Sequence, residues 1–141
     1  MSTRKVIFPA HPHALYKRDG YSPAILSGDF LFCSGMNGAR LDGTPEPELQ
    51  AEVQLAFDNL QGVLAAAGCT FDDVVDLTVF LMDASASIGL VVEAIKKAFA
   101  GVPPSNVTAV GVTWMSGFRV ELKAIARIPH PAASPGDGQE A

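Results

Sequence analysis

One segment of the 141-residue chain carries a helical hydrophobic pattern long enough to organise the whole fold. Apolar residues recur there at intervals of three and four, as on one face of a helix about five turns long. They are Leu49, Val53, Ala56, Phe57, Leu60, Val63, Leu64 and Ala67. Residues 45–48 suit the start of this helix, and Gly68 suits its C-terminal cap. The apolar face must be buried against another layer of structure.

The rest of the chain predicts one further helix and several strands. The second helix begins at Asp83 or Ser85 and ends at Gly101, with Lys96 and Lys97 in its last turn, where the helix dipole favours cations. Strands are predicted at 5–8, 21–27, 30–33, 74–82, 107–114 and 118–128. The dipeptide Gly28-Asp29 between the second and third of these predicts a hairpin.

This order predicts an α+β fold with a mixed six-stranded sheet and two helices on one face. Residues 1–128 form a single domain in this interpretation. The segment 129–141 is rich in Pro, Ala, Ser and Gly and is predicted to be a disordered C-terminal tail.

The sheet face away from the helices is predicted to be half polar and half apolar. Alternation assigns Phe118, Val120, Leu122, Ala124, Ala126 and Ile128, together with Val75, Leu77, Val79 and Leu81, to the helix side. It assigns Arg119, Glu121, Lys123, Ile125 and Arg127, together with Asp76, Thr78 and Phe80, to the other side. Hydrophobic residues make up 48% of the chain and charged residues only 18%. We therefore expect another subunit to cover this face, leaving polar groups at a pocket.

Composition excludes several classes of partner and site. The net charge is −5 and the basic residues are scattered, so nucleic acid is a poor partner. No apolar run is long enough to cross a membrane, and no signal peptide precedes the first strand, which indicates a cytoplasmic protein without a membrane partner. Phosphate-binding glycine loops, HExxH, CxxC and GxSxG motifs are all absent.

A few individual residues allow two interpretations. His11 and His13 are either metal ligands or part of a polar segment; with no third ligand nearby in sequence, we expect no metal. Cys33 and Cys69 are interpreted as buried reduced thiols. Trp114, at the end of a predicted strand, either packs or stacks on a ligand.

Glu121 lies in the middle of the last strand, on the face expected to meet another subunit. A carboxylate there is costly to bury unless it is paired or used in function. It either forms an ion pair with Arg119 or Lys123, or it acts in a site.

Several segments together resemble the YjgF family, also called the RidA or reactive-intermediate deaminase family. The matching segments are 21–24 (YSPA), 28–35 (GDFLFCSG), 58–60 (DNL), 65–68 (AAAG), 75–83 (VDLTVFLMD) and 120–126 (VELKAIA). The resemblance implies a chorismate-mutase-like fold that assembles into a homotrimer with a barrel-like core. It also implies small-molecule pockets between subunits, and hydrolysis of reactive imines and enamines to a 2-oxo acid and ammonia, without a metal or a cofactor.

The resemblance carries over some family site residues. Tyr21 matches a tyrosine of the family pocket, Ser34 and Gly35 match its Ser-Gly backbone, and Glu121 matches the glutamate that helps to place the water. Glu121 and Tyr21 are therefore the expected catalytic residues.

The family's carboxylate-binding arginine does not carry over. Asn106 or Val107 takes its position, depending on the alignment, with Thr108 beside it, and Glu93 replaces an asparagine of the second helix. Losing a charge-assisted pair to a carboxylate costs roughly 1.5–3 kcal/mol of binding. Arg119 is a candidate replacement cation; without one, the pocket should prefer a neutral, cationic or more apolar ligand.

Three functions follow from these residues. The first is a cofactor-free hydrolase or deaminase of a small imine or enamine with a non-standard substrate. The alternatives are a non-catalytic trimeric protein that binds a small ligand, and a deaminase or hydratase specific to one catabolic intermediate. An endoribonuclease activity, which some family members are named for, has little support in an acidic chain without a basic groove.

Overall fold

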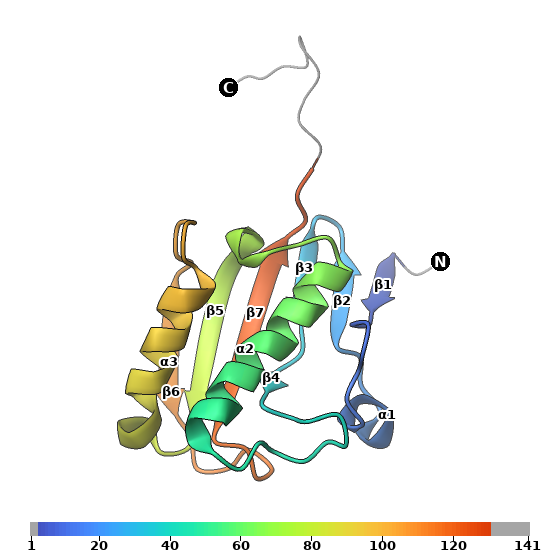
Figure 1. The fold of residues 1–141 in the computed structure, drawn as a ribbon. Helices are drawn as coiled ribbons and strands as arrows, with labels where there is room; N and C mark the ends of the chain where they lie inside the picture. The colour runs from blue at the N-terminus through green and yellow to red at the C-terminus, as the bar shows by residue number, and fades with distance from the viewer. Residues whose placement is uncertain (1–2, 131–141) are drawn as a thin grey trace.

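The computed structural model describes residues 3–130, which form an α+β fold with a mixed sheet (Figure 1). Residues 131–141, most of the predicted tail, lie outside the described part. In chain order the elements are β1 (Arg4–Ile7), α1 (Leu15–Asp19), β2 (Ala24–Ser27), β3 (Phe30–Cys33), β4 (Met36–Asn37), α2 (Leu49–Ala66), the 3-10 helix η1 (Phe71–Asp73), β5 (Val74–Leu81), α3 (Ala84–Ala98), β6 (Val107–Gly111) and β7 (Val120–Arg127).

The sheet order is β1-β2-β3-β7-β5-β6, and the short strand β4 also pairs with β7. The β5–β6 pair is parallel and the other pairs are antiparallel. The predicted hairpin is confirmed: Ser27 pairs with Phe30, and Gly28 between them has a φ of +59°, a conformation that glycine adopts without strain. β6 and β7 follow each other in sequence but are not neighbours, because β5 lies between them.

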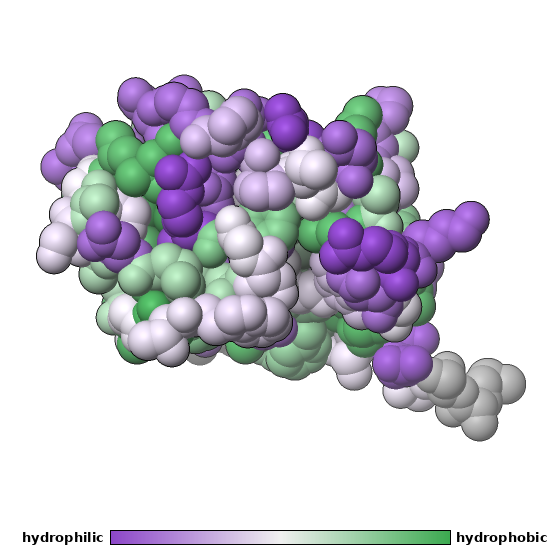
Figure 2. Space-filling model, turned by 90° about the horizontal axis from the view of Figure 1, so that it is seen from below, coloured by the Kyte–Doolittle hydropathy of each residue, from purple (hydrophilic) through white to green (hydrophobic). Residues whose placement is uncertain are grey.

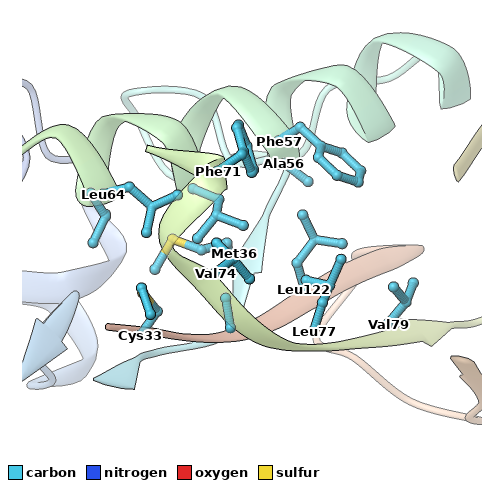
Figure 3. Close-up of a cluster of buried hydrophobic side chains, with 14 of the residues drawn as sticks. Cys33, Met36, Ala56, Phe57, Leu64, Phe71, Val74, Leu77, Val79 and Leu122 are labelled. Carbon is cyan, nitrogen blue, oxygen red and sulfur yellow. The ribbon is translucent and has the colours of Figure 1, made fainter. Parts of the chain in front are cut away.

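The long predicted helix is confirmed as α2, which packs on the sheet through its apolar face. Figure 3 shows Ala56, Phe57 and Leu64 of this helix facing side chains of β5 and β7. Glu48 caps the helix by accepting a hydrogen bond from the Ala51 N–H at 2.9 Å. Both long helices lie on the same face of the sheet, as expected (Figure 1). Of the described helices, none is long and apolar enough to cross a lipid bilayer.

A β-bulge at the start of β5 corrects the predicted alternation. Val74 pairs with Ala126 and Asp76 pairs with Ile125, so Val75 is an extra residue in the strand. The prediction that Val75 faces the core was therefore wrong: Val74 is 5% exposed, whereas Val75 is 43% exposed. The predicted burial of Leu77, Val79 and Leu81 is confirmed.

The sheet face opposite the helices remains open in this chain. Phe30 and Phe32 alternate with the buried Leu31 and Cys33 along β3, and both are partly exposed. All five residues of the edge strand β6 are exposed. On β7, Lys123 and Arg127 are exposed and Glu121 and Ile125 are half-buried, so the predicted mixture of polar and apolar residues is present on this strand. The assignment of Arg119 to this face was wrong, because Arg119 precedes β7 and its side chain binds Glu52 of α2.

Candidate functional site

Three strands bring a carboxylate, an amide and an aromatic ring together at one end of the sheet. Glu121 of β7 pairs in register with Asn37 of β4 on one side and with Phe80 of β5 on the other. Residues directly opposite across neighbouring strands place their side chains on the same face. A cavity of about 350 Å³ opens over these side chains. Its wall includes Tyr21, Asn37, Phe80, Trp114, Phe118 and Glu121.

The cavity lies toward the end of the molecule at which α1 and the loop before β7 are found. Figure 2 views the molecule from this end, where hydrophobic and hydrophilic surface are interleaved. Trp114 is 75% exposed and belongs to the cavity wall, so its packing is slight and its ring is open to a ligand. Trp114 is thus not packed within this chain, and stacking on a ligand stays a prediction.

Gly35 lies against the side chain of Glu121. A Cβ atom at position 35 would overlap with the Glu121 carboxylate, so a larger residue would displace it. The neighbouring Ser34 is held by two hydrogen bonds to the backbone. Its hydroxyl donates to the Ser22 carbonyl oxygen at 2.6 Å, and its backbone N–H donates to the Pro23 carbonyl oxygen. Gly35 and Glu121 thus lie together as predicted, while the Ser34 hydroxyl is already occupied.

Burial has the largest effect on the pKa values of Glu121 and Tyr21 at the site. Burial raises the pKa of Glu121 above its usual value, and the positive charge of Lys123 opposes this only in part. Burial, followed by the charges of Asp19 and Glu121, raises the pKa of Tyr21. Tyr21 is therefore a neutral phenol, able to donate a hydrogen bond, beside a carboxylate that is incompletely solvated.

Neither predicted ion pair of Glu121 is present in the described residues. The Lys123 ammonium group donates to the Cys33 carbonyl oxygen. The Arg119 side chain binds Glu52 of α2: its Nε–H and its backbone N–H each donate to the Glu52 carboxylate at 2.6 Å. Arg119 is therefore engaged in a structural pair and does not line the cavity as a replacement cation.

Glu52 is fully buried. It was not predicted as a buried ion-pair residue, although the sequence pattern alone indicates its burial. It lies one helical turn before Ala56, on the apolar stripe of α2, where a carboxylate needs a partner. The hydrophobic pattern gave no indication of which cation would provide it.

The other predicted binding residues lie away from the cavity in this chain. The Asn106 amide donates to the Val75 carbonyl oxygen at 3.0 Å, and Val107 and Thr108 pair with Leu77 and Thr78. These residues lie along β5 before Phe80, toward its N-terminal half. Glu93 is exposed on α3, 3.7 Å from Lys96. None of these residues is brought next to Glu121 within one chain.

The histidine segment forms a separate polar region. His13 is buried, stacks on Tyr16 with ring centroids 4.0 Å apart, and accepts a hydrogen bond from the Leu15 N–H. Burial lowers its pKa. His11 and His13 line a second cavity of about 560 Å³ against α2. Within residues 3–130, no three His, Cys, Asp or Glu side chains are grouped so that they could hold a metal ion.

The chain matches a protein-family model and several known proteins over most of its length. The family model described as "Endoribonuclease L-PSP" matches residues 11–128. The RutC family protein YjgH of Escherichia coli K12 is 53% identical over 129 residues, which cover 92% of this chain and 98% of that protein. The 2-iminobutanoate/2-iminopropanoate deaminase of Rattus norvegicus is 35% identical over 108 residues, covering 75% of this chain and 78% of that one.

Solved structures agree with the fold. A structure of protein YJGH superposes with a TM-score of 0.88 at 52% identity, covering 92% of this chain and all of that one. The RidA structure from the Antarctic bacterium Psychrobacter sp. PAMC 21119 superposes with a TM-score of 0.79 at 25% identity, covering 88% of this chain and 99% of that one.

Proposed function

The chain belongs to the Endoribonuclease L-PSP family, which is the YjgF/RidA family that its sequence resembles, and from this premise we propose that it is a cofactor-free hydrolase of a small imine or enamine. Such a reaction adds water across a C=N bond and releases a carbonyl compound and ammonia. The observation that carries the proposal is Glu121, a half-buried carboxylate that faces a cavity beside Tyr21 and has no arginine partner within residues 3–130.

The reaction assigns a role to each of these residues. Glu121 takes a proton from water as the oxygen bonds to the carbon of the protonated imine, which gives a neutral carbinolamine. It returns this proton to the amino group, and as the C–N bond breaks and ammonia leaves, it accepts the proton of the carbinolamine hydroxyl, so that the carbonyl forms. Tyr21 and the backbone N–H of Gly35 contact the substrate and hold it against the water. The burial that raises the pKa of Glu121 suits this role, because the carboxylate becomes a stronger base.

The substrate in this proposal differs from that of the deaminase relatives. Segment 103–108 (PPSNVT) contains no arginine, and Arg119 is held by Glu52. A carboxylate on the substrate would therefore lack its forked partner. The proposal includes a small imine that has no free carboxylate. Glu93, Asn106, Val107 and Thr108 remain proposed lining residues, contributed by a neighbouring subunit.

Assembly is part of the same proposal. The open sheet face, with Phe30, Phe32 and the exposed strand β6, supports a homotrimer with pockets between subunits. A cytoplasmic location remains part of the proposal. Native mass spectrometry of the full chain should give three times the monomer mass; a monomer would contradict this part.

A second candidate is favoured by the same missing arginine. The chain could bind a small ligand between subunits without turning it over, or act as a deaminase or hydratase on one catabolic intermediate. Thermal-shift screening with recovery of the ligand separates binding from turnover, because only an enzyme consumes the compound that stabilises it.

The experiment that tests the proposal is ammonia release from an imine generated in situ by a flavin-dependent amine oxidase. The wild-type chain should accelerate release over buffer, and Glu121→Gln should lose most of this acceleration. If Glu121→Gln matches the wild type, or no imine reacts faster than in buffer, the hydrolase is excluded and the binding function remains.

A further inference from the structure

Asn37 lines the cavity and carries a buried oxygen atom that has no hydrogen-bond partner. The residue is 7% exposed, and its Oδ1 is, among residues 3–130, the only buried side-chain nitrogen or oxygen without a partner. An acceptor left unpaired in this way costs about 1–3 kcal/mol. Buried polar atoms are nearly always satisfied, so an exception at a cavity wall indicates a missing partner.

The position of Asn37 is fixed by its neighbours. It pairs in register with Glu121 across β4 and β7, and its carbonyl oxygen accepts a hydrogen bond from the Asn59 amide of α2 at 2.9 Å. Its predecessor, Met36, is buried in the core. The backbone at position 37 is thus anchored from two sides, which presents the amide beside the Glu121 carboxylate.

The charges around the cavity favour hydrogen-bond donors on the ligand. Glu121 and Asn37 both belong to the wall, and each side chain carries an acceptor oxygen. The one basic side chain among the residues lining the described cavity is Arg18, and both of its forked contacts go to Asp19, at 2.9 and 3.0 Å. The wall therefore offers hydrogen-bond acceptors to a ligand, whereas the charge of Arg18 is already balanced by Asp19.

We infer that the Asn37 amide is a specificity-determining contact that accepts a hydrogen bond from a polarised N–H group of the ligand, so that the cavity takes iminium, amine or amidine compounds and rejects carboxylates. This inference rests on the proposed function for the location of the site and names its substrate class. The apolar wall of Phe80, Trp114 and Phe118 would accommodate a flat hydrocarbon part.

The test compares two probes of the same shape, benzamidinium and benzoate, on the full chain. Trp114 is the only tryptophan of the sequence and lies in the cavity wall, so its fluorescence reports occupancy directly. Benzamidinium should bind at least about tenfold more tightly than benzoate. Equal binding, or tighter binding of benzoate, would overturn the inference.

Two variants separate a contact from a merely structural role. Asn37→Leu should weaken benzamidinium about tenfold, because it removes the acceptor. Asn37→Asp, nearly isosteric, should bind benzamidinium more tightly than the wild type and benzoate more weakly. If Asn37→Leu does not fold, the Asp variant alone decides: unchanged or weaker benzamidinium binding would contradict the inference.

The result is independent of turnover. Probe binding that depends on Asn37 would stand even if no imine were hydrolysed, and only the proposed reaction would then fail. Conversely, imine turnover that depends on Glu121 but is unaffected at Asn37, with no preference for benzamidinium, would leave the hydrolase in place and refute the specificity contact.

Discussion

The Glu52 carboxylate accepts both the Nε–H and the backbone N–H of Arg119, and this pair ties the first turn of α2 to the residue that precedes β7. The Glu52 side chain is fully buried, whereas the Arg119 side chain is 40% exposed and also donates to the Pro47 carbonyl oxygen at 3.0 Å. The pair thus holds in place the loop that leads into the strand carrying Glu121.

This asymmetry predicts unequal effects of removing each partner. Arg119→Met leaves a buried carboxylate unpaired and should lower the free energy of unfolding by about 3–5 kcal/mol. Glu52→Gln leaves a half-exposed arginine that can reach water, and the glutamine oxygen still accepts one N–H, so the loss should be nearer 1–2 kcal/mol. Urea denaturation measures both. A larger loss for Glu52→Gln would contradict the structural role of the pair.

The contact between Gly35 and Glu121 predicts a rescue. Gly35→Ala should lower the free energy of unfolding by about 1–3 kcal/mol, because the added methyl group overlaps with the carboxylate. Glu121→Ala should remove that cost, so that the double variant is more stable than Gly35→Ala alone. Gly89→Ala serves as the control, since a methyl group added there would meet open space. Additive losses would refute the contact.

His13 predicts a pH dependence of stability. Its pKa is lowered in the folded chain, so the unfolded chain takes up the proton first as pH falls below about 6.5. The neutral His13 therefore contributes fully to the free energy of unfolding above that pH, and this contribution is lost as the pH falls toward the pKa of His13 in the folded chain. Protonation also ends the hydrogen bond from Leu15. Thermal unfolding of His13→Phe, which keeps a ring against Tyr16, should show a smaller decline between pH 7 and pH 5 than wild type. The more exposed His11→Phe is the matched control; a decline in His13→Phe equal to that of wild type would contradict the prediction.

The two cysteines should be unreactive in the folded protein. Both are buried, and burial raises the pKa of the Cys33 thiol to about 12 and that of Cys69 above its usual value. A chromogenic disulfide reagent should therefore titrate neither thiol until denaturant is added, and then both. Cys33→Ala should leave one reactive thiol after denaturation; rapid reaction in buffer would contradict the burial.

The sequence was sufficient for the elements with strong periodicity. The pattern from Leu49 to Ala67 predicted α2, and Gly28-Asp29 predicted the hairpin, because each signal is local. α1 and β4 were missed because five and two residues are too short to show a period. The bulge at Val75 was missed because it depends on pairing with β7.

In the candidate site, too, some residues could be predicted from the sequence and others could not. Tyr21, Gly35 and Glu121 were predicted from a resemblance. Tyr21 and Glu121 line one cavity and Gly35 lies against Glu121, while their roles stay predictions. Asn37 was not predicted, because its significance depends on register with Glu121 and on an unpaired oxygen. The pairing of Arg119 with Glu52 joins residues 67 positions apart, which no local pattern can reveal.

The pH dependence of ammonia release from a carboxylate-free imine, compared between wild type and Glu121→Gln, decides whether Glu121 is the general base. Because burial raises the pKa of Glu121, the wild-type rate should fall as pH decreases through a value above 4.5, where the base becomes protonated. Glu121→Gln should be slower by a factor of about 10² or more and show no such decline. A variant that matches the wild type in rate and profile would contradict the central role of Glu121.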